Sequence, residues 1–136
     1  MEKTITIKEN WLTRKPRRNG LYATVCLTVI LLFGTFIYLN NIFKAELLMP
    51  ASYFSVFEQH QVWRIWTTLF AHADIHHVLS NLILFLPFAY YLSGYFDFIF
   101  FPVMGFFAGG CVNLVVLYTM PEKGYLIGSS GVVHWM

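Results

Sequence analysis

Charged residues are scarce in this sequence. Only 12% of the 136 residues are Asp, Glu, Lys or Arg, against about 25% in soluble domains. Hydrophobic residues make up 57% of the chain and aromatic residues 19%. This composition excludes an ordinary soluble globular domain and is typical of an integral membrane protein.

Cysteine is also rare, and the usual metal-binding patterns are missing. Cys26 and Cys111 each fall within an apolar run, so we expect two small buried side chains and no disulfide. There is no CxxC pair and no His-Glu-x-x-His motif, and His72 with His76 supplies at most a pair of ligands. Zinc needs three or four, so we expect no metal and no cofactor.

Basic residues are concentrated at the start of the chain. Six of the nine lie within the first nineteen positions, namely Lys3, Lys8, Arg14, Lys15, Arg17 and Arg18. Nucleic-acid binding is the alternative for such a tail, but a basic flank beside a membrane span explains it more simply. We therefore predict a cytoplasmic tail over residues 1–19 and no nucleic-acid partner.

Long uncharged stretches follow this tail. Residues 19–43 carry no charge, and Asp97 is the only charged residue between 78 and 120. A membrane crossing needs about 20 apolar residues, so the first stretch holds one span and the second holds two. We predict an all-α polytopic bundle of the following parts: transmembrane helices at 20–43, 77–96 and 98–120, an interfacial outer loop at 44–76, a second outer loop at 121–127, and the start of a fourth helix at 128–136, with 44–136 forming the core.

The basic tail also sets the expected topology. Because positively charged flanks stay in the cytoplasm, the loops at 44–76 and 121–127 lie outside and the turn at Asp97 lies inside. The expected location is a bacterial inner membrane. The third span also carries Gly105-x-x-x-Gly109 with Asn113 one turn further on. This face should pack closely and point into the bundle.

A serine between glycines is the first candidate for chemistry. In Gly128-Ser129-Ser130-Gly131, Ser130 would enter the fourth helix from the external face. The glycines allow close backbone approach, and a helix N-terminus offers unpaired N–H groups to a developing oxyanion. The alternative is a simple helix cap, since Ser and Gly are common in turns.

Polar residues near the external end of the second span are the next candidates. His77 and Asn81 are four residues apart, so they share a helix face at the expected depth of Ser130. Both can donate hydrogen bonds to an oxyanion; the alternative is a solvated histidine and a structural amide. Upstream, Trp63-Arg64 lies in the outer loop, where Arg64 can bind backbone carbonyls or lipid headgroups.

Together these residues resemble the rhomboid intramembrane serine proteases. The matching residues are Trp63-Arg64, Thr67, Phe70-x-His72, His77-x-x-x-Asn81 and Gly128-x-Ser130-Gly131. The resemblance implies a six-helix bundle that hydrolyses peptide bonds in transmembrane protein substrates within the lipid bilayer. It assigns Ser130 as nucleophile, His77 and Asn81 as the oxyanion-stabilising pair, and a supporting role to Gly128, Gly131, Trp63, Arg64 and His72.

The resemblance also places the general base on a sixth helix, beyond Met136. From Ser130 to Met136 a helix rises only about 10 Å, against a hydrocarbon core near 30 Å. We therefore expect a fragment of a longer reading frame, and we expect these 136 residues alone to be inactive. His134 shares a helix face with Ser130. A base must approach the serine hydroxyl from the side, and a residue on the same helix does not have that geometry. A non-catalytic rhomboid-like protein that binds transmembrane helices is the alternative, and the oligomeric state stays open.

Overall fold

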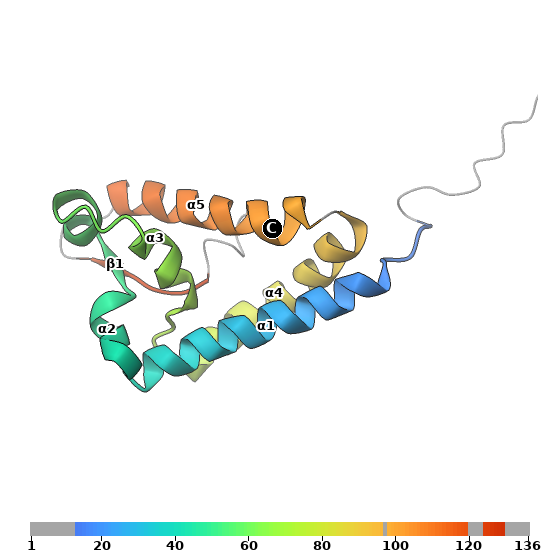
Figure 1. Cartoon of the computed structure of the whole chain (residues 1–136), viewed down its shortest axis with the longest axis horizontal. Coiled ribbons are helices and arrows are strands. Elements are labelled where there is room, and N and C mark those ends of the chain that lie inside the picture. The colour runs from blue at the N-terminus through green and yellow to red at the C-terminus, as the bar shows by residue number, and fades with distance from the viewer. Residues whose placement is uncertain (1–12, 97, 120–123, 130–136) are drawn as a thin grey trace, which may run out of the picture.

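Three long helices dominate the computed structural model, which describes residues 13–96, 98–119 and 124–129 (Figure 1). They are α1 (Arg18–Leu39), α4 (Ile75–Tyr95) and a third span, Ile99–Thr119, built from η4 (Ile99–Met104) and α5 (Gly105–Thr119). Each is long and apolar enough to cross a membrane. The predicted polytopic helical membrane protein is therefore confirmed for these spans.

The helix ends differ from the predicted ones for local reasons. The first span ends at Leu39, not at residue 43, because the Asn40 side chain donates to the Phe36 carbonyl at 2.8 Å and the next residue, Asn41, has a φ of 48°. The third span is interrupted at Phe101, whose φ of −146° and ψ of 126° are extended. Phe101 precedes Pro102, and a residue before proline is biased away from the helical conformation.

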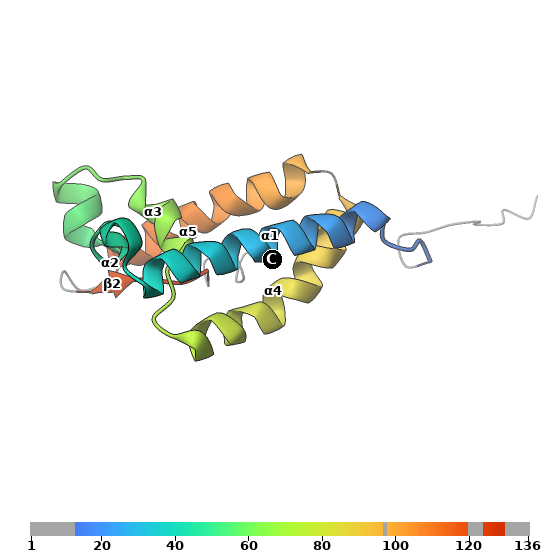
Figure 2. The ribbon, with the colours of Figure 1, turned by 60° about the horizontal axis from the view of Figure 1, so that its bottom comes forward.

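α1 and α4 run antiparallel; the start of α1 lies against the end of α4, and the two helices diverge toward the start of α4 (Figure 2). At one end Gly20 meets Gly94 so closely that a Cβ on Gly20 would lie 2.7 Å from the Gly94 Cα. Between the ends a buried cluster joins α4 to the interrupted third span and to the outer loop; its members are Leu69, Phe85, Ala89 and Phe101. The sequence pattern did not identify the glycine pair.

α5 packs against α3 (Arg64–Thr67) through its small residues. A Cβ on Gly110 would lie 2.2 Å from Trp66 Nε1, so only glycine fits there. Asn113 is buried, and its Nδ2 donates to the Ile65 carbonyl at 2.8 Å. The expectation that this face points into the protein and that the amide finds a partner is thus confirmed.

The outer loop is folded into a series of short elements. They are η1 (Ile42–Lys44), α2 (Ala45–Leu48), β1 (Ala51–Ser52), η2 (Phe54–Glu58), α3 and η3 (Thr68–Phe70). β1 pairs antiparallel with β2 (Tyr125–Leu126), with Ala51 opposite Leu126. This small sheet, which the sequence did not predict, ties the second outer loop to the first.

The two cysteines are not buried, so that prediction was wrong. Cys26 on α1 and Cys111 on α5 are both exposed. A span is apolar on its lipid-facing side as well as inside the bundle. An apolar run therefore does not reveal which of its residues face the protein interior.

The Gly20–Gly94 contact predicts that a larger side chain at Gly20 destabilises the protein. Gly20→Ala should lower the free energy of unfolding by about 1–3 kcal/mol, because the new methyl group would meet backbone that cannot move aside. Titration with SDS, followed by circular dichroism, measures this. Cys26→Val enlarges an exposed side chain of the same helix and should change stability little. Equal effects of the two substitutions would contradict the packing assigned to α1 and α4.

Candidate active site

The Gly128–Ser129 turn is held by η3 of the outer loop. The Gly128 N–H donates to the Thr68 carbonyl at 2.9 Å. The fully buried Thr68 hydroxyl in turn donates to the carbonyl of Leu126, the last residue of β2. Thr68 thus bonds the chain on both sides of Ile127. These two hydrogen bonds fix the position of the turn relative to the outer loop.

Gly128 lies directly against the two polar residues of α4. Asp74 caps this helix by accepting the His77 N–H at 2.8 Å, and Asn81 follows His77 by one turn. A Cβ on Gly128 would lie 2.7 Å from His77 Nε2 and 3.6 Å from Asn81 Nδ2. Its φ of +114° is also one that side chains rarely permit. Both the space and the backbone conformation therefore require glycine here.

The buried Asn81 amide has a nitrogen that no described residue pairs with. Asn81 is 9% exposed, and among the described residues its Nδ2 has no hydrogen-bond acceptor. A buried donor left unpaired costs about 1–3 kcal/mol. Such a group beside Gly128 is therefore available to an acceptor supplied by a bound molecule.

His72 connects the turn to the first span. This imidazole is fully buried; its Nδ1 lies 2.9 Å from Thr35 Oγ1 on α1, and its Nε2 lies 3.2 Å from Ser129 Oγ. The Ser129 backbone N–H also donates to Nε2, at 3.3 Å. An N–H can only donate, so Nε2 accepts and the ring proton of a neutral imidazole sits on Nδ1, facing Thr35.

The surroundings keep this imidazole neutral. Burial, with a smaller contribution from the neighbouring His77, lowers the pKa of His72 to about 4, while the Phe70 carbonyl opposes the shift. The two imidazole rings meet edge to face with centroids 5.2 Å apart. His72 therefore serves as a hydrogen-bonding link at neutral pH and carries no charge there.

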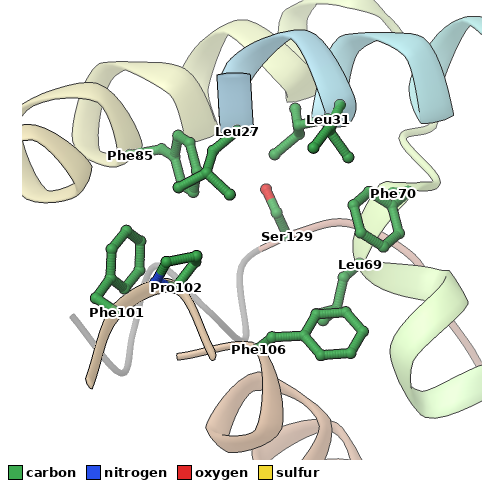
Figure 3. A pocket seen from close by; sticks show the side chains of 10 residues that line it. Leu27, Leu31, Leu69, Phe70, Phe85, Phe101, Pro102, Phe106 and Ser129 are labelled. Atoms are coloured by element: carbon green, nitrogen blue, oxygen red, sulfur yellow. The ribbon is translucent and has the colours of Figure 1, made fainter. Parts of the chain in front are cut away.

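An apolar cavity of about 90 Å³ adjoins the turn (Figure 3). The Ser129 side chain points into it from the wall, and the other lining residues come from α1, η3, α4 and the third span; they are Leu27, Ile30, Leu31, Leu69, Phe70, Phe85, Phe101, Pro102 and Phe106. The surroundings of the turn on this side are therefore nearly free of polar groups, which strengthens each hydrogen bond made there.

Arg64 organises the outer loop. It is only 7% exposed, and its Nη1 donates to the carbonyls of Leu47 and Pro50 at 2.7 and 2.9 Å, while Nε donates to Gln61 Oε1 at 2.5 Å. These acceptors all belong to the loop. Trp63, in contrast, is 52% exposed.

Of the residues singled out in the sequence, the structure brings together His72, His77, Asn81 and Gly128. Ser130, Gly131 and His134 lie outside the described residues. Sequence reasoning missed Thr35 and Ser129. Their hydroxyls gave no signal, because a threonine in a span usually bonds its own helix, as Thr24 does with the Gly20 carbonyl.

The lowered pKa of His72 predicts a pH dependence of stability. The unfolded chain binds this proton with a pKa near 6.5, so stability is fully present above that pH and is lost as the pH falls toward 4. One pKa unit corresponds to about 1.4 kcal/mol, and we expect a loss on the order of 1–2 kcal/mol by pH 5. SDS titrations at pH 7 and 5 measure it.

The matched control is the exposed His76. His76→Gln should keep the pH dependence of the unmodified chain, whereas His72→Gln should remove the part due to this imidazole. If both variants lost stability between pH 7 and 5 as the unmodified chain does, His72 would not be the titrating group.

A family model supports the relationship that these motifs indicate. The model for the rhomboid domain matches residues 59–134, more than half of the chain. Comparisons with the curated proteins and with the solved structures found no match. The matched range contains the outer-loop arginine, the His77–Asn81 pair on α4 and the Gly128–Ser129 turn. The chain belongs to the rhomboid family.

Proposed function

We propose that this chain carries the nucleophile and the oxyanion-binding groups of an intramembrane serine endopeptidase that hydrolyses peptide bonds in transmembrane proteins. The observation that supports it most directly is the buried Asn81 amide beside Gly128, whose Nδ2 has no partner among the described residues. Ser130 follows Gly128 by two residues, so chain connectivity keeps its Cα within about 7.6 Å of the Gly128 Cα.

The proposed reaction is acyl transfer through a tetrahedral intermediate. Ser130 Oγ attacks the scissile carbonyl carbon, and the carbonyl oxygen acquires a negative charge. Asn81 Nδ2, the His77 ring and the Ser130 backbone N–H donate to that oxygen. The general base, which the family resemblance assigns to a histidine of a sixth helix, takes the hydroxyl proton and transfers it to the amine as the C–N bond breaks. Water then hydrolyses the acyl-enzyme and restores Ser130.

A rival serine–histidine pair is present in the structure. Ser129 Oγ lies 3.2 Å from His72 Nε2, and Thr35 orients the other ring nitrogen. Three facts argue against catalysis by this pair: the pKa near 4 makes His72 a weak base, the Ser129 N–H already occupies Nε2, and Ser129 is only 2% exposed. We assign Ser129 and His72 to holding the loop.

We also propose an orientation for the site. The basic tail favours a cytoplasmic N-terminus, which places the His77 end of α4 at the opposite, external face of a bacterial inner membrane. Transmembrane substrates would then be cut near that surface. Protease protection of a tag at either end of α1 tests the orientation.

The adjacent serines provide a matched pair of variants. In the protein as its gene encodes it, Ser130→Ala should reduce kcat/KM for a transmembrane reporter by at least about 10³-fold, since the nucleophile is removed. Ser129→Ala should retain most of the activity, because the Ser129 N–H still donates to His72. Cleavage in proteoliposomes is measured by mass spectrometry. Loss with Ser129→Ala but not with Ser130→Ala would assign the reaction to the rival pair.

A polypeptide of residues 1–136 alone is a second arm of that experiment. It should bind the reporter without cutting it, because the sixth-helix histidine that the resemblance assigns as general base is not among these residues. Serine-dependent cleavage by this polypeptide would overturn that expectation. Binding without cleavage by the encoded protein would instead favour the non-catalytic alternative.

Asn81 should act on the transition state more than on substrate binding. Asn81→Ala should lower kcat by about 10²–10³-fold with little change in KM, since one oxyanion donor is removed. Ser80→Ala is the control, because the exposed Ser80 hydroxyl donates to the His77 carbonyl of its own helix. A rise in KM at constant kcat would indicate that Asn81 binds the substrate in its ground state.

A further inference from the structure

The basic tail is docked onto the end of α4 that lies farthest from His77. The Arg17 N–H donates to the Gly94 carbonyl at 3.0 Å, and the Tyr95 hydroxyl donates to the Arg14 carbonyl at 2.8 Å. Pro16 sits so close to α4 that a Cβ on Gly94 would lie 2.6 Å from the Pro16 Cβ. The tail is therefore held in a defined position at residues 14–17.

An open hollow of about 500 Å³ adjoins the docked tail. Arg14 and Arg17 line it, and the rest of the lining is largely apolar: Tyr95, Phe96, Ile99, Phe100 and Met104. The Phe96 and Phe100 rings stack with centroids 4.6 Å apart. The hollow thus combines guanidinium groups with an aromatic and aliphatic floor.

The position of this hollow indicates which molecules surround it. α1 begins at Arg18, α4 ends at Tyr95 and the third span begins at Ile99, so the hollow lies where three spans reach the same membrane surface. Phosphate headgroups and the first methylenes of acyl chains occupy that depth. The two arginines and the apolar lining match those two parts of a lipid.

We propose that the hollow binds an anionic phospholipid, a site independent of the proposed proteolysis. Arg14 and Arg17 bind the lipid phosphate, and an acyl chain lies along Ile99 and Met104. A guanidinium has five N–H donors, so each arginine can hold a phosphate beside its other contacts. Lys15 and Arg18 are also basic and exposed, and Asp97 is the one acidic residue of the adjacent turn.

The test compares two double variants that remove the same charge. The purified chain in detergent micelles is titrated with phosphatidylglycerol or with phosphatidylcholine of the same acyl chains, and bound lipid is counted by native mass spectrometry. We expect tighter binding of phosphatidylglycerol. Arg14→Gln/Arg17→Gln should weaken it by at least about fivefold, the effect of one basic residue near a membrane surface, and Lys15→Gln/Arg18→Gln by less than about twofold.

A second matched pair of variants tests the apolar part of the lining. Ile99 and Ile83 are each 72% exposed, but only Ile99 lines the hollow, so Ile99→Ala should weaken phosphatidylglycerol binding and Ile83→Ala should not. Equal losses in the two charge variants would overturn the proposal in favour of diffuse attraction by the tail. Equal affinity for the two lipids would also overturn it, as would displacement of phosphatidylglycerol by millimolar inorganic phosphate.

Discussion

The buried imidazole of His72 joins three parts of the chain that are far apart in sequence. Through Nδ1 it binds Thr35 on α1, and through Nε2 it accepts from Ser129 next to the proposed nucleophile. His72 itself lies between η3 and α4. Because the surroundings are apolar, each of these hydrogen bonds is costly to lose. The position of the turn therefore depends on a neutral histidine with a fixed tautomer.

The outer loop also helps to hold the Gly128–Ser129 turn in place. Arg64 donates to its backbone carbonyls at Leu47 and Pro50, and Thr68 bonds the loop to the Gly128 region. Buried backbone groups must be satisfied within the protein, so the short elements between α1 and α4 cannot shift independently of the site. The small β1–β2 sheet adds a second tie between the two outer loops.

α4 makes contacts at both ends of the molecule. Its first turns present His77 and Asn81 to Gly128, and its last turn receives the basic tail at Gly94 and Tyr95. The length of a membrane span separates the proposed chemistry from the proposed lipid site. Gly20 of α1 fixes the Gly94 end of α4, and at the other end Thr35 of α1 binds His72, three residues before α4 begins.

The sequence by itself determined the number of spans in the described part and the face that pairs His77 with Asn81. It also determined the inward direction of Asn113. These features follow from apolar length and from helical periodicity, which are local properties. The tertiary structure alone decided the Thr35–His72–Ser129 link, the small sheet, the docking of the tail and the exposure of the cysteines. His72 is 37 residues from Thr35 and 57 from Ser129, and no local pattern encodes which distant polar group will satisfy a buried one.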